Sequence, residues 1–274
     1  MISYHDRIKD EKFRVALAMV DAGEVEKLEK FLLQNPAIIN QRIDFEETGY
    51  FSNPGLLEFT AENPIRHGKL PGNIIEIVKV ILEAGAKENP AQISYTLGLV
   101  SSGNVARECG VQVPLIDLLC EYGANPDQAM LSALAHAEFD AVEALLKNGA
   151  KVNLAVAAAT NKMGDFEKLL PESNPLERHQ AVALAAQHGR FEILEILLEK
   201  GERPDRFNPA GVHSHSTPLH QAVLTGNLEI VKLLVGAGAR LDLKDKIYQG
   251  TPLDWAVYAK LDDIENYLRL EENI

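Results

Sequence analysis

Apolar residues recur at helical spacing in short segments along the chain. The segment "IVKLLV" (230–235) places them three and four residues apart, as one face of an amphipathic helix requires. Similar segments read "GEVEKLEKFLLQNP" from Gly23, "NIIEIVKVILEAGA" from Asn73, "VPLIDLLCEYGA" from Val113, "AEFDAVEALLKNGA" from Ala137, "GDFEKLLPES" from Gly164, "GRFEILEILLEKGE" from Gly189 and "LDDIENYLRL" from Leu261. The pattern predicts a series of short amphipathic helices.

The ends of these helices carry matching signals. Most begin with an acid that complements the helix dipole: Glu26, Glu76, Asp140, Glu167, Glu192, Glu229 and Asp263. Several end in a glycine that can adopt the left-handed backbone: Gly85, Gly123, Gly149, Gly201 and Gly238. Each of the last two amphipathic helices should be preceded by another helix that begins at a threonine followed by proline, Thr217 or Thr251.

The segments therefore predict about eight helix-turn-helix units in a single domain, residues 1–274. Their approximate bounds are 12–40, 54–88, 91–126, 127–152, 153–176, 177–203, 215–243 and 249–274. One hairpin cannot bury its apolar faces alone, so neighbours must stack into a solenoid. Residues 41–53, 64–72, 100–112 and 204–215 interrupt the pattern and are expected to be inserted loops.

The unit "STPLHQAVLTGNLEIVKLLVGAGA" (216–239) closely resembles the ankyrin repeat, and so does "TPLDWAVYAKLDDIENYLRL" (251–270). The other copies lack "TPLH" and resemble it less fully. The resemblance implies an all-α ankyrin-repeat solenoid with irregular insertions. The central glycines follow one another more closely than the family's period of about 33 residues, which predicts shortened loops there.

In the ankyrin family, the concave face is built from loop tips and from the last residues of each first helix. Aligning the family's "A-A-x-x-G" pattern, with Gly164 as one of its glycines, assigns this partner-binding position to Asp21, His136, Lys162, Met163, Gln187, His188, Leu224, Thr225 and Tyr258. Met163, Leu224 and Tyr258 are the expected anchors, because methionine and aromatic residues are enriched at interfaces. The loop residues His213 and His215 are added to this predicted site.

The stretch "GVHSHSTPLH" (211–220) raises the alternative of a metal site. The resemblance implies that His220 hydrogen-bonds locally and holds the turn. His213 and His215 alone fall short of the three or four ligands that zinc needs. We therefore expect no metal and no cofactor, and keep a metal-dependent enzyme using these two histidines as the alternative.

Charge and cysteine content narrow the function. Forty acidic and 27 basic residues give a net charge of −13, which disfavours nucleic acid and anionic membranes and favours a basic partner. Cys109 and Cys120 cannot form a disulfide framework, and no apolar run is long enough to cross a bilayer. We therefore expect a cytoplasmic protein, and because both ends carry charged residues that would cap the stack, we expect a monomer.

The predicted function is a non-enzymatic protein–protein interaction module or adaptor. No nucleophile with an adjacent base, phosphate-binding loop or paired-carboxylate motif occurs in the sequence. Cys109 lies near Arg107 but has no histidine in its sequence context. An exported effector that acts on the proteins of another cell stays open as a further alternative.

Overall fold

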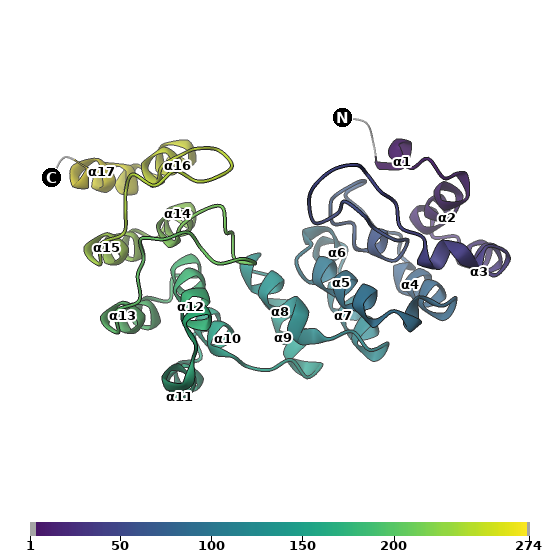
Figure 1. Ribbon diagram of the computed structural model, residues 1–274, viewed down its shortest axis with the longest axis horizontal. Coiled ribbons are helices and arrows are strands. Elements are labelled where there is room, and N and C mark those ends of the chain that lie inside the picture. The colour runs from purple at the N-terminus through teal and green to yellow at the C-terminus, as the bar shows by residue number, and fades with distance from the viewer. Residues whose placement is uncertain (1–3, 273–274) are drawn as a thin grey trace. The chain divides into compact units, whose positions relative to one another are not determined.

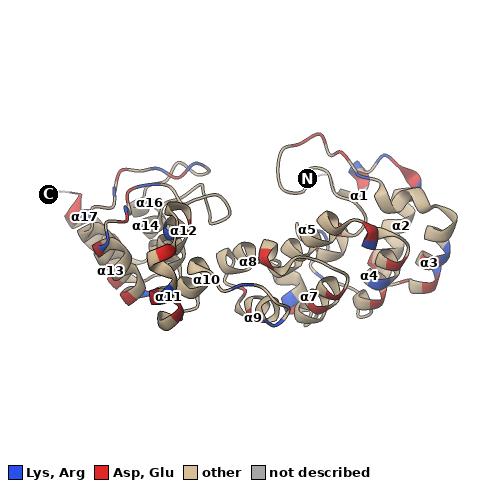
Figure 2. Ribbon diagram, turned by 60° about the horizontal axis from the view of Figure 1, so that its bottom comes forward, with Lys and Arg blue, Asp and Glu red and all other residues tan. Residues whose placement is uncertain are grey.

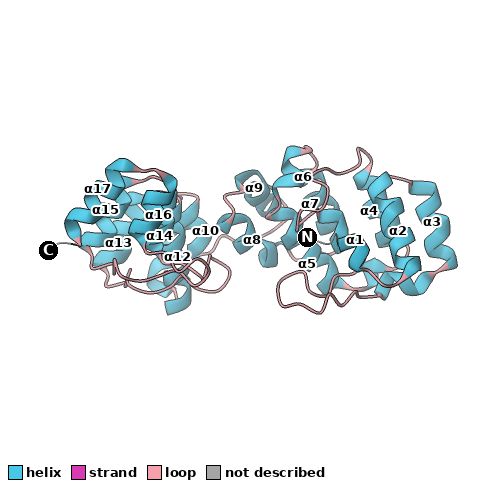
Figure 3. Ribbon diagram, turned by 90° about the horizontal axis from the view of Figure 1, so that it is seen from above, coloured by secondary structure: helices cyan, strands magenta, loops and turns pink. Residues whose placement is uncertain are grey.

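The computed structural model describes residues 4–272, which form helices joined by turns and loops (Figure 3). No β-strand occurs within that range. Consecutive helices pair as hairpins, and hairpins stack on their neighbours, so the prediction of an all-α solenoid is confirmed. The contacts divide the chain into two compact units, residues 1–151 and 152–274. The assignment of residues 1–274 to a single domain stays a prediction.

The N-terminal unit consists of paired helices and two long irregular segments (Figure 1). Its α-helices are α1 (Tyr4–Arg7), α2 (Glu11–Ala22), α3 (Val25–Gln34), α4 (Ile74–Glu83), α5 (Pro90–Ser101), α6 (Asn104–Glu108), α7 (Gln112–Glu121), α8 (Pro126–Ala135) and α9 (Phe139–Lys147). Its 3₁₀ helices are η1 (Pro36–Asn40), η2 (Glu58–Ala61) and η3 (Ala86–Glu88). The unit predicted at 54–88 has only η2 where a first helix is expected, since Pro54 and Pro64 confine it. Residues 100–112, expected to be irregular, contain α6.

Residues 41–53 form an ordered loop against this unit. The Ile43 N–H donates to the Pro54 carbonyl at 2.9 Å, and the Phe45 N–H donates to the Ser52 carbonyl at 3.0 Å. The rings of Phe45 and Phe51 pack on Phe59, with centroid distances of 6.4 and 5.1 Å. Burial of these aromatic rings therefore holds the insertion in place.

The C-terminal unit stacks hairpins around one apolar core. Its helices are α10 (Leu154–Ala159), α11 (Met163–Leu169), η4 (Leu170–Glu172), α12 (Pro175–Gln187), α13 (Phe191–Glu199), α14 (Pro218–Leu224), α15 (Leu228–Gly236), α16 (Pro252–Ala259) and α17 (Asp262–Glu271). First and second helices both supply fully buried side chains, such as Leu219 of α14 and Leu234 of α15. The first helices pack on one another in order, α10 on α12, α12 on α14 and α14 on α16.

The helix starts predicted at Thr217 and Thr251 are confirmed, whereas Glu167 lies beyond the first turn of α11, where Asp165 is the acid. The Thr217 hydroxyl accepts the backbone N–H of His220, and the Thr251 hydroxyl accepts that of Asp254. In both cases the side chain three residues on accepts the threonine N–H in return, which completes a capping box. These caps fix where α14 and α16 begin.

In six of the hairpins the turn contains one residue with a left-handed backbone, whereas α5 is followed by Ser102 and Gly103 with negative φ. The left-handed residue recurs at Gly23, Ala137, Asn161, Gly189, Gly226 and Lys260, with φ between 57° and 70°. The placement of Gly164 at this turn was wrong: Asn161 occupies it, with φ of 57°, and Gly164 lies in the first turn of α11. Asparagine tolerates this backbone because its short polar side chain hydrogen-bonds locally. Ala159 and Thr160, rather than Lys162 and Met163, therefore end the first helix of this hairpin.

The turn positions described above predict opposite effects on stability for alanine at Gly164, inside a helix, and at Gly189, in a left-handed turn. Gly164→Ala should raise the free energy of unfolding by about 0.5 kcal/mol, because the position is helical and an added Cβ meets nothing within 4 Å. Gly189→Ala, the control, should lower it by about 1–2 kcal/mol, because Gly189 has a φ of +66° and its Cβ would lie 2.7 Å from Asn227 Nδ2. Urea unfolding followed by circular dichroism measures both. Equal losses in the two variants would contradict the register.

Candidate interaction surfaces

The ends of the first helices form a row in the C-terminal unit. The two residues before each left-handed turn are Ala159 and Thr160, Gln187 and His188, Leu224 and Thr225, and Tyr258 and Ala259. Helix α14 packs on α16 (Figure 1). Leu224 and Tyr258 each lie two residues before the left-handed turn, at Gly226 and Lys260, so they occupy equivalent places in the two helices. Their side chains are 57% and 90% exposed, values that leave large apolar areas in water.

The remaining predicted members of this row offer less apolar surface. Gln187 is buried and His188 is half-buried. Met163 is partly buried and packs against the apolar core, and Lys162 is exposed at the N-cap of α11. Thr225 is exposed beside Leu224. The exposed apolar part of the row is thus confined to α14 and α16.

Residues 240–251, called here the finger, connect α15 to α16 and are organised by one buried carboxylate. Asp245 Oδ1 accepts the backbone N–H groups of Ile247 at 2.9 Å and Tyr248 at 2.7 Å. Its Oδ2 accepts the Gly250 N–H at 2.9 Å and the Trp255 indole N–H at 3.0 Å. Burial disfavours the charged form, but these hydrogen bonds outweigh it and lower the pKa of Asp245 to about 2.

The tip of the finger exposes two apolar side chains. Ile247 is 60% exposed and Tyr248 is 77% exposed, because their backbone N–H groups turn inward to Asp245 and their side chains turn out. Together with Leu224 and Tyr258 they make up half of the large exposed apolar residues in the described part of the C-terminal unit. Exposed aromatic and aliphatic groups of this kind mark interaction sites.

The inserted loop 204–215 is fastened to the finger. The Lys246 backbone N–H donates to the His215 carbonyl at 2.8 Å, and its ammonium donates to the Ser214 carbonyl at 3.0 Å. The same ammonium lies 4.3 Å from the centre of the Phe207 ring. The conformation of this loop is therefore set by contacts with the next repeat.

The three histidines of this region lie near Trp255 but form no metal centre. The ring centroids of His213 and His215 are 5.8 Å apart, and His215 lies 6.4 Å from Trp255. His220 is buried; its Nδ1 lies 2.7 Å from Thr217 Oγ1 and its Nε2 lies 3.1 Å from the Gly250 carbonyl. Burial lowers the pKa of both His215 and His220. Between residues 4 and 272, no three His, Cys, Asp or Glu side chains converge to hold a metal.

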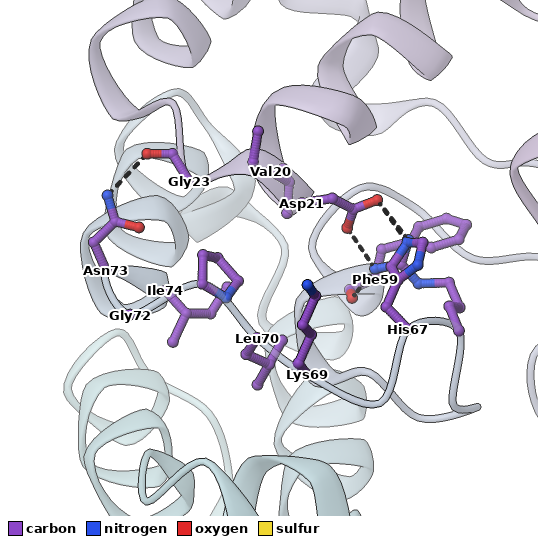
Figure 4. Close-up of a pocket in the computed structure, with 13 residues that line it drawn as sticks. Val20, Asp21, Gly23, Phe59, His67, Lys69, Leu70, Gly72, Asn73 and Ile74 are labelled. Carbon is purple, nitrogen blue, oxygen red and sulfur yellow. Dashed lines mark hydrogen bonds and ion pairs between the residues drawn. The ribbon is translucent and has the colours of Figure 1, made fainter.

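In the N-terminal unit, a pocket of about 550 Å³ lies beside the end of α2 (Figure 4). Asp21 binds the Arg66 guanidinium through both oxygens, at 2.7 and 3.0 Å, and His67 Nε2 lies 3.2 Å from it. Arg66 also pairs with the buried Glu62 at 3.0 Å and lies over the Phe59 ring. Asp21, predicted to face a partner, therefore holds the insertion 64–72 in place.

Other candidate residues carry no reactive arrangement. His136, predicted on the same face, is exposed at the end of α8. Cys109 is exposed, whereas Cys120 is half-buried. Burial raises the pKa of the Cys120 thiol to about 11, so it is a thiol rather than a nucleophilic thiolate at neutral pH.

Comparison with known proteins identifies the family of this chain. A family model described as ankyrin repeats in three copies matches residues 154–245 and 208–274. Human cyclin-dependent kinase inhibitor 2A is 30% identical over 120 residues, which cover 42% of this chain and 74% of that protein. The chain is an ankyrin repeat protein.

Further relatives agree with this assignment. Human cyclin-dependent kinase 4 inhibitor B is 29% identical over 147 residues, covering 54% of this chain and 89% of that protein. The human transient receptor potential cation channel subfamily A member 1 is 29% identical over 188 residues, covering 66% of this chain but only 15% of the channel. Ankyrin repeats form a protein–protein interaction module. No helix in the described range is long and apolar enough to cross a membrane.

Two features of this ankyrin repeat protein were missed by sequence reasoning. Ile247 and Tyr248 are adjacent apolar residues in the otherwise polar segment "KDKIYQG", and that contrast was an available signal. The pairing of Asp21 with Arg66 joins residues 45 positions apart, and no repeat pattern relates them. Insertions follow no periodicity, so their contacts cannot be inferred from the repeat.

Asp245→Asn tests the organisation of the finger. The variant should lower the free energy of unfolding by about 1–3 kcal/mol, because an amide cannot accept on both sides where the carboxylate does. The folded-state pKa of Asp245 is below its usual value, so the wild type should lose this contribution as pH falls from about 4 towards 2. The free energy of unfolding is measured across that pH range by urea unfolding, followed by the fluorescence of Trp255, the sole tryptophan. The difference in the free energy of unfolding between wild type and variant should shrink at low pH. A difference that stays constant with pH would contradict this role of Asp245.

Asp21→Asn tests the contact that holds the insertion. Loss of the Asp21 charge should speed amide hydrogen exchange across residues 64–72. It should also lower the free energy of unfolding by about 2 kcal/mol, because the Arg66 side chain is only 6% exposed and would lose a partner. Glu24→Gln is the control, since its ion pair with Lys27 is largely exposed. Unchanged exchange in Asp21→Asn would show that other contacts hold the segment.

Proposed function

We propose that this ankyrin repeat protein is a non-enzymatic adaptor that binds a partner protein through the finger surface, defined as Leu224, Thr225, Ile247, Tyr248 and Tyr258. The observation that carries the proposal is the exposure of Tyr258 at 90% and of Leu224 at 57%, at the ends of two helices that pack on each other. Large rigid aromatic side chains supply most of the binding energy at protein interfaces. A cytoplasmic monomer belongs to the same proposal.

Two features of the structure support this proposal, and the similar proteins leave the class of partner open. The finger is held by Asp245 and by loop 204–215, so its tip is presented in one conformation. The pocket beside α2 is partly occupied by the ion pair of Asp21 with Arg66. The similar proteins include kinase inhibitors and a channel subunit, so they indicate no single class of partner.

A double variant tests the proposal. Leu224→Ser with Tyr258→Ser should remove partners captured from lysate of the native host by wild type, because two apolar anchors are lost. Leu33→Ser with Leu270→Ser is the control, since these leucines are also exposed, at 74% and 68%, but lie outside the finger surface. Quantitative mass spectrometry compares the three captures, with circular dichroism to verify folding. Equal loss in both variants, or in neither, would contradict the proposed surface.

A further inference from the structure

The turn that ends α9 holds the one asparagine of the sequence that is followed by glycine, Asn148 before Gly149 in "LLKNGAK" (145–151). In such a pair the backbone nitrogen of the glycine can attack the asparagine amide carbon, because glycine has no side chain to obstruct the approach. Ammonia leaves and a five-membered succinimide ring forms. Water then opens the ring to aspartate, or to isoaspartate, in which the main chain runs through the former side chain. The segment therefore holds the groups for a modification that consumes only water.

The folded turn opposes this reaction. The Gly149 N–H donates to the Leu146 carbonyl at 3.1 Å, and the Ala150 N–H donates to the Leu145 carbonyl at 3.0 Å, as in a Schellman motif. Asn148 has a ψ of 15°, and ring closure requires ψ to turn far from this value so that the Gly149 nitrogen reaches the amide carbon. The end of α9 must therefore open before the ring can close.

The side chain of Asn148 is also engaged. Its Nδ2 donates to Asp117 Oδ1 of α7 at 2.6 Å and to the Ala144 carbonyl at 2.9 Å. The Lys147 ammonium lies 3.3 Å from the other carboxylate oxygen of Asp117. Since α9 packs on α7, these bonds join two neighbouring hairpins. The amide donates to two acceptors, and a carboxylate cannot take that role because it only accepts.

Conversion of Asn148 to a carboxylate would turn these attractions into repulsions. Two carboxylates would face one another at the contact with Asp117, and the new charge would lie at the negative end of the helix dipole. Acidic residues already outnumber basic ones on α7 and α9 (Figure 2). The Lys147 side chain is 73% exposed, so solvent screens its charge and it offsets the repulsion weakly. The turn would therefore close less readily after the reaction than before it.

We propose that Asn148 is a deamidation site controlled by opening of the α9 end, and that its product loosens the packing of α9 on α7. A closed chain is protected, whereas a chain that opens here is converted irreversibly. Isoaspartate would also add a methylene group to the main chain, which alters the spacing of both turn hydrogen bonds. The modification thus records that this hairpin has opened.

Mass spectrometry of the full chain tests whether opening controls the reaction. The protein is incubated at mildly alkaline pH in buffer, in urea below the unfolding transition and in denaturing urea, and deamidation is followed in the peptide that contains Asn148. The rate should be at least about tenfold lower in buffer than in denaturing urea, and should already rise below the transition, because local opening precedes global unfolding. Equal rates in buffer and in denaturing urea, or no deamidation of the unfolded chain, would overturn the proposal.

An exchange of amide and carboxylate tests the effect of the product. Asn148→Asp should lower the urea concentration at the midpoint of unfolding, followed by circular dichroism. Asp117→Asn with Asn148→Asp should recover at least about half of that shift, because an amide again meets a carboxylate at this contact. Asn266→Asp is the control: it adds the same charge at an exposed position and should leave the midpoint unchanged.

Two results would contradict the proposed effect on packing. One is a midpoint for Asn148→Asp equal to that of wild type, and the other is a double variant that recovers nothing. If Asn148→Asp does not fold, the double variant still decides the question, because it should fold where the single variant does not.

Discussion

The left-handed turn inside six of the hairpins is the constraint on which the stack depends. One residue with positive φ reverses the chain between two helices, and its position decides which residues end the first helix and which begin the second. Glycine meets this demand at Gly23, Gly189 and Gly226, and Asn161, Ala137 and Lys260 meet it at a backbone cost. The apolar stripes of neighbouring hairpins then face one another, and burial of those stripes stabilises the solenoid.

The surfaces of the C-terminal unit follow from this arrangement. Because the turns align, Leu224 and Tyr258 fall on adjacent helices at the same height of the stack. The finger adds Ile247 and Tyr248 through the inward bonds of Asp245. A chain with a large net negative charge thus exposes several uncharged apolar side chains in this unit.

The sequence predicted the helices and caps well, because helical periodicity and Thr-Pro starts depend on nearby residues alone. It predicted Asp21, His136, Leu224 and Tyr258 at helix ends, since their turns carry the expected spacing. It misplaced Lys162 and Met163, because glycine is the commonest left-handed residue and Gly164 stood three positions beyond Asn161, which makes the turn. Burial of Gln187 and the clasp between Asp21 and Arg66 depend on segments distant in the sequence, which local patterns do not relate.

The inward bonds of Asp245 have a thermodynamic consequence. Loops usually lose conformational entropy when a partner orders them, which costs about 1–2 kcal/mol per residue fixed. In the finger, folding has already ordered the backbone of Ile247, Tyr248 and Gly250 around one carboxylate. A partner therefore meets a pre-organised tip, and more of the contact energy is available as affinity.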